Sequence, residues 1–125
     1  MEKAHRELKA LSRIDPLTNF SNRRDINHKI DYEISRFERK RSSETFFIIP
    51  GDIVGFKEIY LKLGGSGADN LITQVAESIV KECRKVVTVG RWGTEAFMII
   101  VPEAHFSGAA RLAENLCKAF EDKFF

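Results

Sequence analysis

The apolar run Phe-Phe-Ile-Ile at residues 46–49 constrains the fold more than any other stretch of this sequence. No polar residue interrupts it, and such a pattern predicts a strand buried on both faces of a sheet. The run is followed by Pro50, Gly51 and Asp52, so a carboxylate stands where the strand meets solvent. Ligands bind to open α/β sheets at such strand ends. A turn aspartate after Pro-Gly is the alternative, and this stretch alone favours it.

The rest of the chain alternates helical and strand patterns. Apolar residues recur at helical spacing in four segments, which are Asp25–Arg41, Phe56–Leu63, Ala68–Lys85 and Ser107–Lys123. The glycine-rich stretch 64–67 is expected to break the helical pattern between the second and third of these segments. Two short runs, Val86–Val89 and Ala96–Val101, flank a compact turn and predict an antiparallel strand pair that ends at Pro102.

Each helical segment has one apolar face, and the faces in Ala68–Lys85 and Ser107–Lys123 are expected to be buried. The residues on these faces are Ile26, Ile30, Ile34 and Phe37, then Phe56, Ile59, Tyr60 and Leu63, then Leu71, Ile72, Val75, Ile79 and Val80, and finally Ala110, Leu112, Ala113, Leu116 and Phe120. The order of elements predicts an α/β (α+β) fold with a βααββα core. In that fold an antiparallel or mixed sheet is flanked by helices, and we expect the helices on one face.

Composition favours one domain without a strong charge preference. The chain has 125 residues, 43% of them hydrophobic, and a net charge of +2, which argues against a dedicated DNA-binding protein. Cys83 and Cys117 have no metal-ligand spacing and are read as reduced thiols. No signal peptide and no membrane-spanning run is evident, so we expect a cytoplasmic protein without membrane contact in this segment.

The first 14 residues are charged and carry Leu8, Leu11 and Ile14 at helical spacing. Pro16 disfavours helix at Asp15, so a break is expected there. We expect residues 1–14 to form a signalling helix or linker, and residues 15–125 to form the domain. A frayed terminus is the alternative for residues 1–14, and the sequence supports both equally.

Four segments carry motifs in a recognisable order. They are Asp15-x-Leu17-Thr18-x-Phe20-x-Asn22-Arg23-Arg24, Asp52-Ile53-Val54-Gly55-Phe56-Lys57-x-Ile59, Gly64-Gly65-Ser66-Gly67-Ala68-Asp69 and Arg91-Trp92-Gly93-Thr94-Glu95-Ala96-Phe97. Their order and spacing resemble those of GGDEF domains, and the resemblance spans nearly the whole chain. It implies a palm-like nucleotide-cyclase fold and a place in bacterial cyclic di-GMP signalling. Active members are diguanylate cyclases, which join two GTP molecules, one in each subunit of a transient dimer.

The resemblance also implies roles for individual residues. Asp52, the Ile53 carbonyl and Glu95 would hold Mg²⁺, or Mn²⁺ in its place, and Glu95 would assist deprotonation of the attacking hydroxyl. Oxygen ligands of this kind suit Mg²⁺, which bridges phosphates and can acidify a hydroxyl. The substrate-binding residues would be Phe56 and Lys57 at the triphosphate, Asp69 at the guanine edge, and Gly93.

Several positions depart from the family pattern. Val54 stands where the family has the second Asp of DxD, Tyr60 where it has the guanine-binding Asn, and Gly65 where it has the His of the glycine-rich loop. In the signature, Thr94 replaces the second Gly and Ala96 replaces the Glu. The RxxD product site begins at Arg84, and Val87 replaces its Asp. Thr94 should crowd the nucleotide, because a β-branched residue fills space and resists positive φ. A buried polar edge without a partner costs about 1–3 kcal/mol. Together these changes predict a weak or inactive cyclase.

The family continues beyond the helix at 107–123 with one further strand and one further helix. Without them the edge of the strand at 45–52 would be exposed, which predicts a shortened chain or strand exchange in a dimer. A homodimer is expected through this edge or through the N-terminal helix, together with an upstream sensory domain.

Three hypotheses follow. The first is a catalytically silent regulatory or dimerising module, of which a domain that binds GTP without turnover is a variant. The second is an active cyclase with an unusual site, supported by Asp52, Lys57, Asp69 and Glu95. The third is an α/β interaction scaffold that binds no nucleotide and is unrelated to the family.

Overall fold

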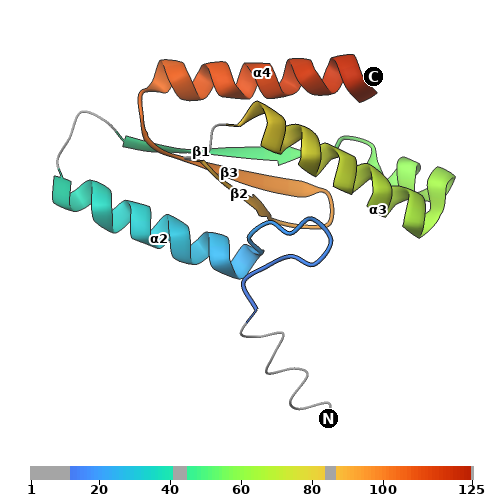
Figure 1. Cartoon of the computed structure of the whole chain (residues 1–125), viewed down its shortest axis with the longest axis horizontal. Coiled ribbons are helices and arrows are strands. Elements are labelled where there is room, and N and C mark those ends of the chain that lie inside the picture. The colour runs from blue at the N-terminus through green and yellow to red at the C-terminus, as the bar shows by residue number, and fades with distance from the viewer. Residues whose placement is uncertain (1–11, 41–44, 84–86, 125) are drawn as a thin grey trace, which may run out of the picture.

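The structure is a computed structural model that describes residues 12–40, 45–83 and 87–124. Its elements are α2 (Arg23–Lys40), β1 (Thr45–Asp52), α3 (Phe56–Glu82), β2 (Thr88–Arg91), β3 (Ala96–Ala104) and α4 (Phe106–Phe124) (Figure 1). The α+β class and the predicted order of elements are therefore confirmed. The helix predicted at 1–14 lies almost entirely outside the described residues. None of the described helices has the length and apolar content that a membrane span needs.

The three strands form one antiparallel sheet in the order β1-β3-β2. The predicted antiparallel pairing of the last two strands is confirmed, although β2 begins later than predicted, at Thr88. The strand β3 does not stop before Pro102 as predicted but continues to Ala104. The register with β1 shifts between Thr45 and Phe47, opposite this proline. Proline is tolerated at such irregularities because the ladder is already interrupted there.

The prediction that the first strand is buried on both faces is wrong. Within the described residues β1 pairs only with β3, and Ile48 is 39% exposed. The Ile53 N–H donates to the Glu95 carbonyl (2.9 Å), so the N–H groups of residues 53, 51 and 49 point toward β3. Bonding direction alternates along a strand, so the nitrogen of Pro50 lies on the outer edge and its missing N–H costs no bond to β3.

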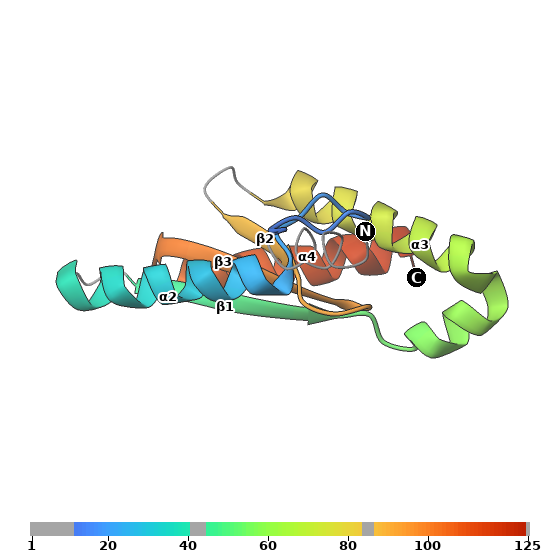
Figure 2. The same cartoon turned by 90° about the horizontal axis from the view of Figure 1, so that it is seen from below.

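The sheet lies between two helical layers, so the prediction of helices on one face is wrong. Figures 1 and 2 show α2 on one face of the sheet and α3 with α4 on the other. The central strand β3 is apolar on both sides, because Phe97, Ile99 and Val101 join the core cluster with α3 and α4 while Ile100 alternates to the opposite face. On that opposite face the fully buried Ile26 of α2 packs over Gly90 of β2.

The helix α2 begins at Arg23, two residues earlier than predicted. Asn22 caps it, since the Asn22 side-chain oxygen accepts a hydrogen bond from the Asp25 N–H (3.0 Å). The predicted apolar stripe is buried only at its start, because Ile34 and Phe37 are 42% and 45% exposed. Figure 2 shows that the C-terminal part of α2 extends past the sheet.

The helix α3 is bent at the predicted glycine-rich stretch. Gly64 has φ 73° and ψ −179°, a combination outside the helical region and essentially restricted to glycine. Beyond it, Ala68, Ile72, Val75 and Ile79 are buried against the sheet and α4. The predicted burial of Val80 is wrong, because its side chain is more than half exposed. Tyr60 and Leu63, which share the predicted apolar face before the bend, are also more than half exposed.

Candidate functional site

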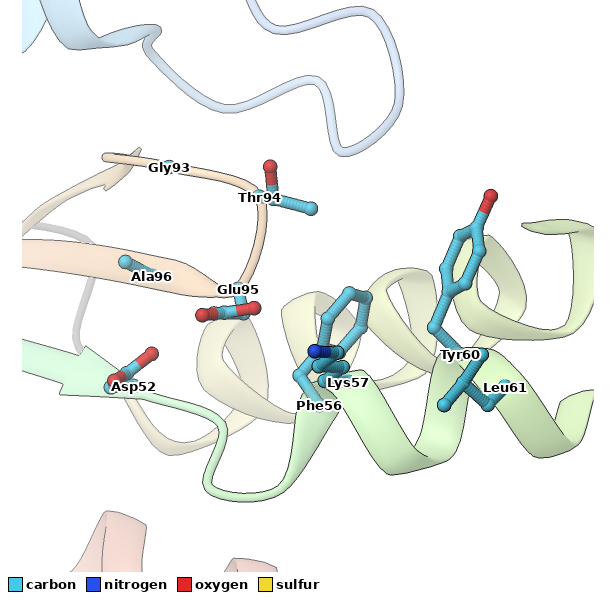
Figure 3. A pocket seen from close by; sticks show the side chains of 9 residues that line it. All are labelled: Asp52, Phe56, Lys57, Tyr60, Leu61, Gly93, Thr94, Glu95 and Ala96. Carbon is cyan, nitrogen blue, oxygen red and sulfur yellow. The ribbon is translucent and has the colours of Figure 1, made fainter. Parts of the chain in front are cut away.

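A pocket of about 620 Å³ opens where β1 ends, between the β2–β3 hairpin and the first turns of α3. Nine residues line it: Asp52, Phe56, Lys57, Tyr60, Leu61, Gly93, Thr94, Glu95 and Ala96 (Figure 3). Most of the residues to which the sequence gave a site role, or which depart from the family motif, are in this set. Leu61 was missed, although it is four residues after Lys57 and therefore on the same face of the helix.

The strand register brings the two candidate metal ligands together. Asp52 pairs with Ala96, and the N–H of Ile53 is bonded to the carbonyl of Glu95. Figure 3 shows the carboxylates of Asp52 and Glu95 projecting into the same space at the mouth of the pocket. Asp52 is exposed and Glu95 half-buried. Within residues 12–40, 45–83 and 87–124 no group of three or more His, Cys, Asp or Glu could hold a metal ion.

Gly55 turns the chain sharply from β1 into α3. Its φ of 74° and ψ of 20° are left-handed, and it caps the helix without a side-chain hydrogen bond. Phe56 is buried in the core and anchors the first turn, which leaves Lys57 exposed beside the pocket. The N-terminal N–H groups of a helix favour anions, so this wall of the pocket suits a phosphate.

Backbone hydrogen bonds close the hairpin loop at 92–95. Trp92 and Gly93 both donate to the Ala96 carbonyl, at 2.8 and 3.2 Å. The strain expected at Thr94 is absent, because the φ of Thr94 is not positive. Among the described non-glycine residues, a positive φ occurs at Asn19 instead. The effect of Thr94 is therefore reduced to the space that its side chain fills at the tip of the loop.

Other predicted site residues lie outside this pocket. Asp69 is exposed on α3 beyond the bend, and Val54 is 85% exposed on the turn before α3; neither lines the pocket. Gly65 lies beside the pocket wall, since a Cβ built there would be 3.5 Å from the Tyr60 hydroxyl. Val87 lines a different cavity of about 540 Å³, formed by the other ends of β2 and β3 with α4.

The hairpin is also tied to the loop that precedes α2. The Arg91 guanidinium lies 3.3 Å from both carboxylate oxygens of Asp15 and donates to the Thr94 carbonyl at 3.0 Å. Burial by itself would raise the pKa of Asp15, but hydrogen bonds from Thr18 and the charge of Arg91 outweigh it, so the pKa is lowered. The sequence showed Asp15 and Arg91 only as motif letters and gave no sign that they meet.

Comparison with known families identifies the chain. The family described as "Diguanylate cyclase, GGDEF domain" matches residues 12–123, which is most of the sequence. The chain belongs to the GGDEF family. The resemblance seen in the four motifs is thus confirmed, and the alternative of a scaffold unrelated to the family is wrong.

Curated relatives and solved structures agree with this assignment. The GGDEF domain is 29% identical over 124 residues to the bifunctional diguanylate cyclase/cyclic di-GMP phosphodiesterase MucR of Pseudomonas aeruginosa, covering 99% of this chain and 18% of MucR. It superposes on the diguanylate cyclase SiaD of P. aeruginosa, in complex with its activator SiaC, with TM-score 0.79, 26% identity and coverage of 95% of this chain and 45% of SiaD. For the GGDEF domain of DgcB from Caulobacter crescentus in complex with c-di-GMP, the TM-score is 0.78 at 27% identity, covering 83% and 58%.

The GGDEF domain spans less than a fifth of the length of MucR, and 15% of the diguanylate cyclase DgcP of P. aeruginosa. The family and the fold are therefore shown for residues 12–123. The roles of single pocket residues remain predictions.

Proposed function

We propose that this GGDEF domain binds GTP together with Mg²⁺ and acts as a regulatory module, with cyclase activity far below that of an intact site. One observation carries the proposal: Asp52 and Glu95 project into one pocket that also contains Lys57 and the N-terminal turn of α3 (Figure 3). Two carboxylates suit a magnesium ion, and a lysine with the N–H groups of a helix N-terminus suits the phosphates that the ion accompanies.

The donor set fits Mg²⁺ bound jointly with a nucleotide. Mg²⁺ is commonly held by one or two carboxylates, with waters and substrate phosphates completing its coordination. Asp52 and Glu95 would supply the carboxylates, and the Ile53 carbonyl is the third candidate ligand. When bound, the ion would offset the triphosphate charge and make the attacking hydroxyl more acidic. Lys57 and the first turn of α3 would bind the phosphates.

The lining of the pocket supports weak turnover. Tyr60 places a phenol where the family has an amide for guanine, and Asp69 does not line the pocket. One unpaired polar group on the base costs about 1–3 kcal/mol, or roughly five- to 150-fold in affinity. Thr94 fills space beside Glu95 that a glycine would leave open, and Ala96 removes one carboxylate of the signature, so several such losses combine.

The proposed regulatory role extends to assembly. Joining two GTP molecules requires two subunits. Among the described strands β1 pairs only with β3, so its outer edge is the surface that we propose for pairing with a second strand. SiaD is seen with an activator protein and the DgcB domain with c-di-GMP. By analogy we propose a homodimer whose state an upstream sensory domain controls.

An active diguanylate cyclase is the second candidate, favoured by the joint presence of Asp52, Lys57 and Glu95 in one pocket. Incubation with GTP and MgCl₂ separates the candidates when cyclic di-GMP is measured by chromatography and binding by thermal shift. We expect a magnesium-dependent shift with little product. Efficient product formation would establish the cyclase instead, and no shift at all would leave a family member that serves only as an interaction scaffold.

Two sets of variants sharpen this experiment. Asp52→Asn and Glu95→Gln should abolish the magnesium-dependent shift, while Asp31→Asn, an exposed acid on α2, should not change it. The double variant Thr94→Gly with Ala96→Glu asks whether the hairpin limits turnover. We expect product to rise at least tenfold if it does, and an unchanged rate would move the cause outside the hairpin.

A further inference from the structure

The loop before α2 and the hairpin are joined by backbone hydrogen bonds. The Arg91 N–H donates to the Ser21 carbonyl at 2.8 Å, and the Asn22 N–H donates to the Arg13 carbonyl at 2.8 Å. Isolated bridges connect Ser21 to Ile14 on one side and to Gly90 on the other. Residues 13–23, here called the N-terminal clamp, therefore extend the sheet beside β2.

The Arg91 side chain connects the clamp to the loop that carries Glu95. Its guanidinium contacts Asp15 at one end and the Thr94 carbonyl, one peptide bond before Glu95, at the other. The side chains of Arg91 and Asp15 are only 15% and 16% exposed. The Arg91 Nε is buried without a hydrogen-bond partner. A buried N–H without a partner costs free energy, and the charged hydrogen bonds of the same guanidinium to Asp15 and Thr94 offset this cost.

Asp15 is itself held firmly. One of its carboxylate oxygens accepts hydrogen bonds from the Thr18 N–H at 3.0 Å and the Thr18 hydroxyl at 2.8 Å. The Asp15 backbone N–H donates to the Phe20 carbonyl at 2.7 Å, and Asn19 closes the turn with φ 64°. The anion is thus fixed by its own loop before it meets Arg91.

A second contact acts on the same hairpin from the start of α2. The Arg23 guanidinium lies 4.3 Å from the centroid of the Trp92 ring, within the range of a cation–π interaction. The backbone N–H of Trp92 in turn donates to the Ala96 carbonyl across the loop. The clamp therefore holds the loop at Trp92 and at Thr94, on both sides of Gly93.

We infer that the N-terminal clamp positions Glu95 relative to Asp52, with Arg91 as the positioning residue and Asp15 as its anchor. Asp52 sits at the end of β1, whereas Glu95 sits in a loop that the clamp restrains from the opposite side. The Glu95 carbonyl stays bonded to the Ile53 N–H beside Asp52, so a displacement of the clamp would act on the loop at Trp92 and Thr94 and reorient the Glu95 side chain relative to Asp52. This makes the domain's N-terminal end a control point for the site. The ligand named in this inference rests on the proposed function, but the restraint on the loop does not.

The test uses the chain's single tryptophan, which lies in the hairpin itself. Asp15→Asn keeps the shape of the side chain and removes its charge, and Asp31→Asn is the matched control. We expect acrylamide to quench Trp92 at least twofold more strongly in ligand-free Asp15→Asn, with the control unchanged. Affinity for GTP in MgCl₂ should fall about tenfold, while affinity for GTP in EDTA should not change.

Arg91→Lys provides a second route, because lysine keeps the charge but cannot bridge Asp15 and Thr94 as a fork. It should behave like Asp15→Asn, and the double variant should be no worse than either single one, because the two residues act as a unit. Unchanged quenching in folded Asp15→Asn and Arg91→Lys would overturn the inference. If the parent does not bind GTP with Mg²⁺, the proposed function fails, whereas the quenching result still decides whether the clamp restrains the loop.

Discussion

Gly90 offers the sharpest test of the packing, because it is where α2 approaches the sheet most closely. A Cβ built on Gly90 would collide with Cγ1 and Cδ1 of Ile26 and lie 3.2 Å from the Ser21 carbonyl oxygen. Ile26 is fully buried, so its side chain cannot turn out into solvent without breaking the packing between α2 and the sheet. Forcing a methyl group into such a core costs about 1–3 kcal/mol. The reduced freedom of the unfolded chain returns about 0.4–1 kcal/mol, so Gly90→Ala should destabilise by roughly 1–2 kcal/mol.

Urea unfolding followed by far-UV circular dichroism measures this change. With a slope of about 2 kcal/mol per molar urea, the midpoint should fall by roughly 0.5–1 M. Gly51→Ala is the matched control in the same sheet, because a Cβ there meets nothing within 4 Å. Its midpoint should stay within about 0.25 M of the parent, corresponding to a surface effect near 0.5 kcal/mol.

The compensating variant tests the cause directly. Ile26→Ala removes both colliding carbons and alone should cost about 2–5 kcal/mol through the cavity it leaves. Combined with Gly90→Ala, the new methyl group enters that cavity, so the double variant should be more stable than the sum of the two effects by at least about 1 kcal/mol. Additive effects, or a Gly90→Ala protein as stable as the parent, would refute the packing that we describe.

Three further predictions concern charge, thiols and the sheet edge. Because the pKa of Asp15 is lowered, its carboxylate stabilises the fold at pH values above the usual pKa of 3.8, and this contribution is lost as pH falls through the lowered pKa. Below about pH 4, the free energy of unfolding should therefore fall less steeply with pH in Asp15→Asn than in the parent. Equal slopes in the two proteins would contradict the ion pair. Burial, followed by the Glu82 carboxylate, raises the pKa of Cys83, whereas Cys117 is exposed. A thiol reagent at pH 8 should thus modify Cys117 at least about tenfold faster, which mass spectrometry of single-cysteine variants can verify. Pro50→Val would add an N–H to the outer edge of β1 and should increase self-association, which analytical ultracentrifugation measures. An unchanged sedimentation profile would show that this edge does not pair with a second chain.

Periodicity predicted the existence and order of the elements well, because the relevant signals are local. The amphipathic pattern of α4 and the glycines at the bend of α3 depend on neighbours within a few residues. The position of each strand within the sheet was not predictable in the same way. An apolar run such as residues 46–49 fits either a central strand or an edge strand, and only the pairing partners decide which one is formed.

The site was predictable where motif residues are carried to one place by strand pairing. Asp52 and Glu95 lie at the same end of the sheet because β1 and β3 pair in this register. The resemblance implied that both acids hold one ion, but the pairing of these two strands was not predicted. The strain expected at Thr94 did not follow, since the conformation of a loop depends on the contacts around it and not on the residue alone. The contact between Asp15 and Arg91 spans 76 residues and has no periodicity that could reveal it.

The bend at Gly64 divides α3 into two parts with separate tolerances to substitution. Before it, Phe56 is the buried residue, Ile59 is partly buried and the other side chains are exposed. After it, the helix contributes much of the core. Replacements such as Tyr60 can therefore accumulate in the first part without loosening the second. If the proposed function holds, ligand preference can change in this domain without loss of stability, and a segment of about two helical turns is open to exchange in protein engineering.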